Sequence, residues 1–101
     1  MNVDIRGMMT IEEIKKRSLP HFQAMGVRRA ALFGSFARGE ETDESDLDFL
    51  VDLPNSLNLL DVVHLKNLLE DEFNRGVDLI EFSCIKPRIR ENVLHDQIVL
   101  L

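Results

Sequence analysis

The sequence contains a single cysteine and no tryptophan or tyrosine, and these absences limit the kinds of protein it can encode. The cysteine, Cys84, cannot form a disulfide within the chain and has no cysteine or histidine neighbours at metal-site spacing. We therefore expect Cys84 to act as a small hydrophobic residue of the core. Without Trp or Tyr, the chain also lacks the basic, aromatic stripe on which single-stranded nucleic acids stack.

Long hydrophobic runs and an excess of positive charge are missing as well. No apolar run approaches the roughly 18 residues of a membrane span, so no membrane association is expected. The formal net charge of −6 argues against a general affinity for DNA or RNA, which depends on clustered lysine and arginine. The first residues, MNVDIRGMMT, lack the basic start and long apolar centre of a secretory signal, which favours a cytoplasmic protein.

Length and local signals predict one small mixed domain. The 101 residues, 45% hydrophobic and 30% charged, suit a single domain over residues 1–101. Capping residues, glycines and prolines divide it into alternating helices and short strands. The predicted elements are a helix from Thr10 to about Met25 with a kink or break at Pro20, a strand at 27–33, a short helix at 36–41, a strand at 46–53, a helix from Ser56 or Asn58 to 74–76, a strand at 77–82, a helix from Pro87 with Ile89, Val93 and Leu94 facing inward, and an apolar end at 98–101 that is an edge strand or a helix tail.

This order predicts an α+β fold, in which a small mixed β-sheet carries helices packed on one face. Acidic side chains inside the predicted strands would then lie on the opposite face. Asp46 and Asp48 are separated by one residue, so a strand projects both carboxylates to the same side. Asp78, in the next predicted strand, supplies a third acid. Three clustered carboxylates repel one another unless a cation neutralises them, and such ligands suit two Mg²⁺ or Mn²⁺ ions.

A glycine and a serine follow the first predicted strand. Gly34 lets the backbone approach an anion closely, and Ser35 offers a hydroxyl and the amides of the short helix behind it. This turn therefore predicts a binding site for a triphosphate. Two readings of Arg38 stay open: it adds charge beside the phosphates, or it pairs on the surface with a nearby acid, Glu40, Glu41 or Asp43.

The arrangement of these residues resembles that of a known enzyme superfamily. Gly34-Ser35, then ten residues, then Asp46-Leu47-Asp48, with Asp78 in a later strand, is similar to the signature of the nucleotidyltransferases that share the DNA polymerase beta palm. The longer stretch LFGSFARGEETDESDLDFLVDL resembles the minimal nucleotidyltransferases, prokaryotic proteins with little beyond the catalytic domain. The resemblance extends over nearly the whole chain.

The resemblance implies an activity and a partner. The activity is transfer of AMP from ATP to an acceptor hydroxyl, with Gly34 and Ser35 holding the triphosphate and Asp46 and Asp48 holding both metal ions. Asp78 would ligate the catalytic metal and help to deprotonate the acceptor. Similar proteins are often antitoxins of a helical HEPN-domain ribonuclease toxin, and they are reported to modify a tyrosine of that toxin.

Two other functions remain open on the sequence. The chain could neutralise a toxin by binding alone, or it could act as an oligomeric nucleotidyltransferase on small molecules. In a third, purely structural reading, the three aspartates are exposed strand acids without a function. The sequence shows no extra domain for the acceptor, so we expect another molecule, or another copy in a homo- or hetero-oligomer, to supply it.

Overall fold

The computed structural model describes residues 9–42 and 44–101. Residues 1–8, on which the expectation about a secretory signal depends, and Asp43, one proposed partner of Arg38, lie outside the described residues. The elements in chain order are α1 (Ile11–Ala24), β1 (Arg29–Phe33), α2 (Gly34–Arg38), β2 (Leu47–Asp52), α3 (Leu59–Phe73), β3 (Val77–Glu81), the 3₁₀ turn η1 (Phe82–Cys84), α4 (Pro87–Asp96) and β4 (Ile98–Val99).

The strands form one mixed sheet in the order β3-β2-β1-β4. β1 pairs antiparallel with β2 and with β4, whereas β2 and β3 run parallel. The parallel pair requires a crossover, which α3 supplies because it lies between these strands in the chain. The predicted fold class is confirmed, and the apolar end at 98–101 contributes an edge strand.

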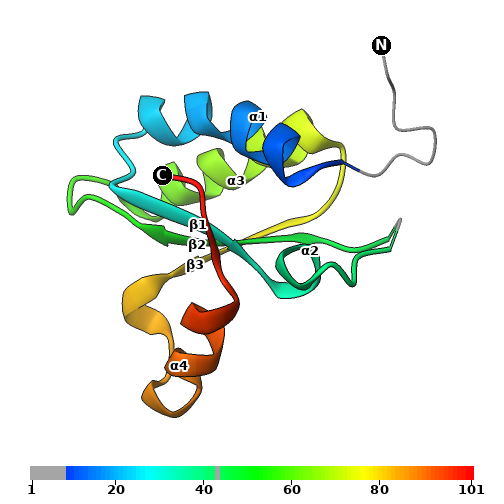
Figure 1. Ribbon diagram of the computed structural model, residues 1–101. Coiled ribbons are helices and arrows are strands. Elements are labelled where there is room, and N and C mark those ends of the chain that lie inside the picture. Colours follow the sequence, from blue (N-terminus) through cyan, green and yellow to red (C-terminus); the bar gives the residue numbers. More distant parts are fainter. Residues whose placement is uncertain (1–8, 43) are drawn as a thin grey trace.

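Helices cover both faces of the sheet to different extents (Figure 1). α1 and α3 lie side by side on one face, where Phe22 meets Phe49 of β2 edge-on with ring centroids 5.4 Å apart. The prediction of helices on one face holds for these two. α4 lies on the other face, where its Val93 and Leu94 pack against a smaller apolar cluster of Ala31, Leu50 and Ile85. The face expected to hold acids is therefore partly covered by a helix.

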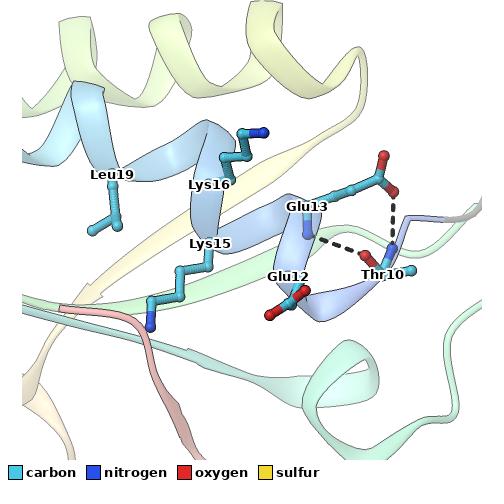
Figure 2. A pocket seen from close by; sticks show the side chains of 6 residues that line it. All are labelled: Thr10, Glu12, Glu13, Lys15, Lys16 and Leu19. Carbon is cyan, nitrogen blue, oxygen red and sulfur yellow. Dashed lines mark hydrogen bonds between the residues drawn. The ribbon is translucent and has the colours of Figure 1, made fainter.

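A side-chain cap sets the start of α1. The Thr10 hydroxyl accepts from the Glu13 amide at 3.1 Å, and Glu13 accepts from the Thr10 amide at 3.2 Å (Figure 2). This capping box satisfies amides that the helix itself cannot. α1 then continues through Pro20 to Ala24 without the predicted break, because Ser18 and Phe22 on either side of the exposed proline are fully buried.

Several local expectations need correction. Cys84, expected in the core, is exposed at the end of η1, where the chain turns over the sheet. The short helix begins at Gly34 rather than at residue 36, and Asp46 lies just before β2 rather than inside it. Ile89, expected to face inward, is 45% exposed because it lines an open recess between α4 and the sheet. Among the described residues, no helix combines the length and apolarity needed to cross a membrane.

Glu72 joins the two helices that cover the core. Its carboxylate accepts from Nε of Arg17 at 3.0 Å and lies 3.1 Å from Nε2 of His21, both on α1. These contacts lower the pKa of Glu72, with the hydrogen bond to His21 as the main cause. Because the folded-state pKa is lowered, the stabilisation is present above the ordinary value of 4.5 and is lost as the pH falls below it.

We expect Glu72→Gln to lower the free energy of unfolding by about 1 kcal/mol at pH 7 and by less at pH 3. Urea denaturation at both pH values measures the difference. Asp71→Asn is the matched control, because Asp71 is the preceding residue of α3 and is exposed. An equal loss of stability in the two variants would contradict the interhelical role of Glu72.

Candidate active site

The parallel pairing of β2 and β3 places two of the predicted acids side by side. Asp48 is the register partner of Asp78, and Leu50 is the partner of Ile80 two residues further on. Successive side chains of a strand alternate between faces, so these four share the face opposite α1 and α3. Asp46, two residues before Asp48, lies at the entrance of the same strand.

Gly34 lies directly against Asp48. Its φ of +76° is in the left-handed region that favours glycine. A Cβ atom at this position would come within 2.3 Å of Oδ2 of Asp48, far inside a van der Waals contact. Residue 34 is therefore glycine for two independent reasons, the backbone conformation and the space that the carboxylate occupies. The first turn of α2, with Ser35, begins beside this carboxylate.

The crowding of acids changes the titration of Asp48. Its pKa is raised from 3.8 to about 6, first because the side chain is partly buried and then because Asp78 hydrogen bonds to it. The charges of Asp78 and Asp46 raise the pKa further, and the charge of Arg38 lowers it. This is the pattern expected where carboxylates share a site without a cation.

Asp46 is positioned by Arg75 and Gly76, which follow the end of α3. A Cβ atom on Gly76 would lie 2.5 Å from Oδ1 of Asp46, so a larger residue would displace this carboxylate. Nη1 of Arg75 donates to the carbonyl oxygen of Ser45 at 2.9 Å, and the amide of Leu47 donates to that of Gly76 at 3.0 Å. A glycine immediately before an acid-bearing strand was the available signal for a close approach.

The position of Arg38 agrees in part with both roles left open above, the surface ion pair and the charge beside the phosphates. Its Nε donates to Oε1 of Glu40 at 3.1 Å, which is the surface pair, and its side chain is 45% exposed. Its charge also acts on Asp48, and with Gly34 it lines a cavity of about 170 Å³ between α2 and α4. Arg38 therefore lies at the edge of the acidic cluster rather than inside it.

The three aspartates match Mg²⁺ or Mn²⁺ in donor chemistry, because hard divalent cations prefer carboxylate oxygens. The close approach of Asp48 and Asp78 and the raised pKa of Asp48 support the match, since a bound cation would relieve the repulsion between these carboxylates. Within the described residues, no three His, Cys, Asp or Glu side chains are yet arranged as a group that could hold an ion. The carboxylates would therefore have to turn toward a shared cation.

A further hollow of the described surface lies away from these acids. It measures about 520 Å³ and follows the first turns of α1, where Lys15, Lys16 and Leu19 line it together with Thr10 and two glutamates (Figure 2). Figure 2 shows Lys15 and Lys16 pointing away from one another and Glu13 engaged with Thr10. Mixed, diverging charges of this kind are typical of a solvated helix face.

The repulsion at Asp48 predicts a measurable effect on stability. A raised folded-state pKa means that the group favours folding below pH 3.8 and that this contribution is lost as the pH rises through about 6. In EDTA at pH 7.5, we therefore expect Asp48→Asn to be more stable than the wild type by roughly 1 kcal/mol, after allowance for solvent screening. Thermal unfolding at pH 7.5 and pH 4 should show the gain at the higher pH only.

The sequence matches a family profile described as polymerase beta nucleotidyltransferase over residues 12–101. The match spans nearly the whole chain, and the chain belongs to this family of nucleotidyltransferases. Its curated relatives have a more specific name. A Methanocaldococcus jannaschii protein named "putative protein adenylyltransferase" is 38% identical over 93 residues, covering 92% of this chain and 100% of the relative. Protein adenylyltransferase MntA of Thermococcus cleftensis is 37% identical over 93 residues, covering 88% and 94%.

Solved structures agree with this assignment. A structure described as a "putative minimal nucleotidyltransferase" superposes with a TM-score of 0.77 at 36% identity, covering 89% of this chain and 95% of the other. A Shewanella oneidensis MNT antitoxin in complex with a tri-AMPylated HEPN toxin has a TM-score of 0.68 at 16% identity, covering 89% and 71%. The second likeness is one of fold alone. The predicted family resemblance is confirmed.

Proposed function

We propose that this nucleotidyltransferase transfers AMP from ATP to a hydroxyl group of a partner protein and thereby acts as an antitoxin. The observation that carries the proposal is the contact between the Gly34 turn and Asp48, with Asp78 beside it in register. The turn proposed to bind phosphate and the acids proposed to bind cations are therefore in direct contact. The names of the curated relatives support AMP as the group transferred.

Each residue of the cluster has a chemical role in this proposal. Phe33, the N-cap of α2, makes no side-chain capping bond, so the first amides of α2 near Gly34 and Ser35 can donate to the triphosphate. Asp46, Asp48 and Asp78 would hold two Mg²⁺ ions. When bound, such ions neutralise phosphate charge and polarise the acceptor hydroxyl.

The proposed transfer replaces one phosphorus–oxygen bond by another. A bond forms between the acceptor oxygen and the α-phosphorus of ATP, the bond from that phosphorus to the bridging oxygen breaks, and pyrophosphate leaves. Asp78 is the exposed carboxylate of the pair and takes the proton of the acceptor hydroxyl. Arg38, at the edge of the cluster, adds positive charge on the side of the phosphates.

A HEPN-type toxin is the proposed partner, with a tyrosine as the acceptor. The support is the fold shared with an antitoxin whose HEPN toxin carries AMP. The net charge of −6 favours a protein acceptor over RNA. A chain acting by contact alone is the competing function, and it differs in requiring no carboxylate at positions 46, 48 or 78.

The test is a labelling reaction. Purified protein, ATP carrying a labelled α-phosphate, MgCl₂ and a HEPN-domain toxin from the same organism are incubated, and the toxin is analysed by intact mass and peptide mapping. We expect a mass increase of one AMP per modified residue and its loss in EDTA. Protection of cells by Asp46→Asn and Asp48→Asn variants, without any label on the toxin, would instead support neutralisation by binding.

A further inference from the structure

An apolar recess lies next to the acidic cluster on the same face of the sheet. Its volume is about 180 Å³, below the roughly 300 Å³ at which pockets for drug-sized ligands begin. The sheet supplies one wall of the recess, and η1 and α4 supply the other. The apolar side chains that line it include Phe33, Leu50, Ile80, Cys84, Ile89 and Val93.

The position of the recess relative to the acids follows from the strand register. Leu50 and Ile80 each follow an acid, Asp48 or Asp78, by two residues on the same face. Two residues along a strand correspond to roughly 6.5–7 Å. The floor of the recess therefore lies about the length of a phenol ring from the two acidic residues. Phe33 lines the recess and immediately precedes Gly34 in the chain.

The recess also presents apolar surface to solvent. Ile80 is 38% exposed and Ile89 is 45% exposed, whereas Leu50 at the floor is fully buried. Apolar side chains gathered around a hollow beside reactive groups are typical of a ligand site. A polar acceptor such as the side chain of serine or threonine would gain nothing from this lining. Among the hydroxyl side chains, only tyrosine combines an apolar body with a hydroxyl at its tip.

We propose that this recess is the acceptor subsite and that it selects a tyrosine by holding the phenol ring against the exposed side chains of Ile80 and Ile89, above the buried Leu50. The ring lies along the strands, so that its hydroxyl reaches Asp78. The inference rests on the proposed AMP transfer to a tyrosine and adds to it the place where the acceptor side chain binds. Gly34 and Arg38 line the neighbouring cavity, which leaves that side for the nucleotide.

Cys84 provides a direct reporter, because it lines the recess, is exposed and is the only cysteine of the chain. The rate of its alkylation by N-ethylmaleimide is measured with AMP-PNP and Mg²⁺, with and without N-acetyl-tyrosinamide at tens of millimolar. N-acetyl-serinamide is the matched probe without a ring. We expect tyrosinamide to slow alkylation at least threefold and serinamide or AMP-PNP alone to leave the rate unchanged.

Other occupants of the recess would give different results. Protection by AMP-PNP alone, with no further effect of tyrosinamide, would assign the recess to the nucleotide and overturn the proposal. Protection that rises with protein concentration in the absence of any probe would assign it to a second copy of the chain, which also overturns it. Equal protection by serinamide and tyrosinamide would remove the selectivity for a ring.

Kinetics of transfer test the same subsite independently. Ile80→Thr and Ile89→Gln should each raise the KM for the acceptor about tenfold, the loss expected when one apolar contact of a ring is removed. The dissociation constant of AMP-PNP should stay within about twofold. Leu59→Gln is the control, because Leu59 is a 77% exposed apolar residue of α3, away from the recess. Circular dichroism checks that all three variants fold.

The two proposals fail in different ways. If no acceptor is labelled while tyrosinamide still protects Cys84, the AMP transfer is wrong and the recess stands as an aromatic site. If the toxin is labelled by the wild type while the KM of both isoleucine variants is unchanged, the transfer stands and the recess is not the acceptor subsite.

Discussion

Replacement of Asp48 by asparagine is expected to lower AMP transfer at least ~1,000-fold, and Asp46→Asn should have an effect of the same order. In the proposed mechanism, each variant removes a charged oxygen ligand at the point where the triphosphate and the acceptor meet. The fold should persist, because the buried core lies on the other face of β2, with Leu47, Phe49 and Val51. Steady-state labelling of the toxin measures the loss.

The matched control for these variants is Asp52→Asn. Asp52 ends the same strand but lies outside the cluster, where Nη2 of Arg28 donates to its carboxylate at 3.0 Å. We expect this variant to transfer AMP at the wild-type rate and to lose at most about 0.5 kcal/mol of stability. A similar loss of activity in Asp52→Asn and Asp48→Asn would indicate a general effect of β2 rather than a specific role of the clustered acids.

Gly34→Ala is the second substitution with a large expected effect. The added Cβ would displace the Asp48 carboxylate, and the left-handed backbone would cost about 1 kcal/mol or more. We expect a loss of transfer of at least ~100-fold, since a misplacement of about 1 Å at a reacting group can have that effect. Labelling rates and thermal unfolding measure the two consequences separately.

Gly39→Ala separates backbone strain from the clash with the carboxylate. Gly39 has a similar φ of +73° at the end of α2, but an added Cβ would meet nothing within 4 Å. It should therefore be destabilised by about 1 kcal/mol and retain most of its activity. If Gly39→Ala were as inactive as Gly34→Ala, the strain of α2 would explain the loss, and the contact with Asp48 would not.

Local signals predicted most of the elements but not all of their bounds. The capping box at Thr10 and the glycine turn at residue 34 act through neighbours in the chain, so they can be read from the sequence. The bounds of short elements depend on contacts with residues elsewhere in the chain. For this reason α2 starts at Gly34 and Asp46 lies just outside β2, in contrast to the predicted bounds. Cys84 was wrongly assigned to the core because a cysteine is usually buried, and no local signal marks the exposed turn in which it lies.

The order of residues along the chain shows which chemical groups are available: the acids at 46, 48 and 78, the glycine and serine at 34 and 35, and the order of helices and strands. It can do so because alternation, capping and turn preferences are properties of adjacent residues. The distances between these groups depend on tertiary contacts. The parallel register of β2 and β3 brings Asp78 to Asp48, Gly76 confines Asp46, and α4 folds over the acidic face to form the recess. These contacts join residues far apart in the chain, and their geometry is fixed by packing of the core rather than by any local preference.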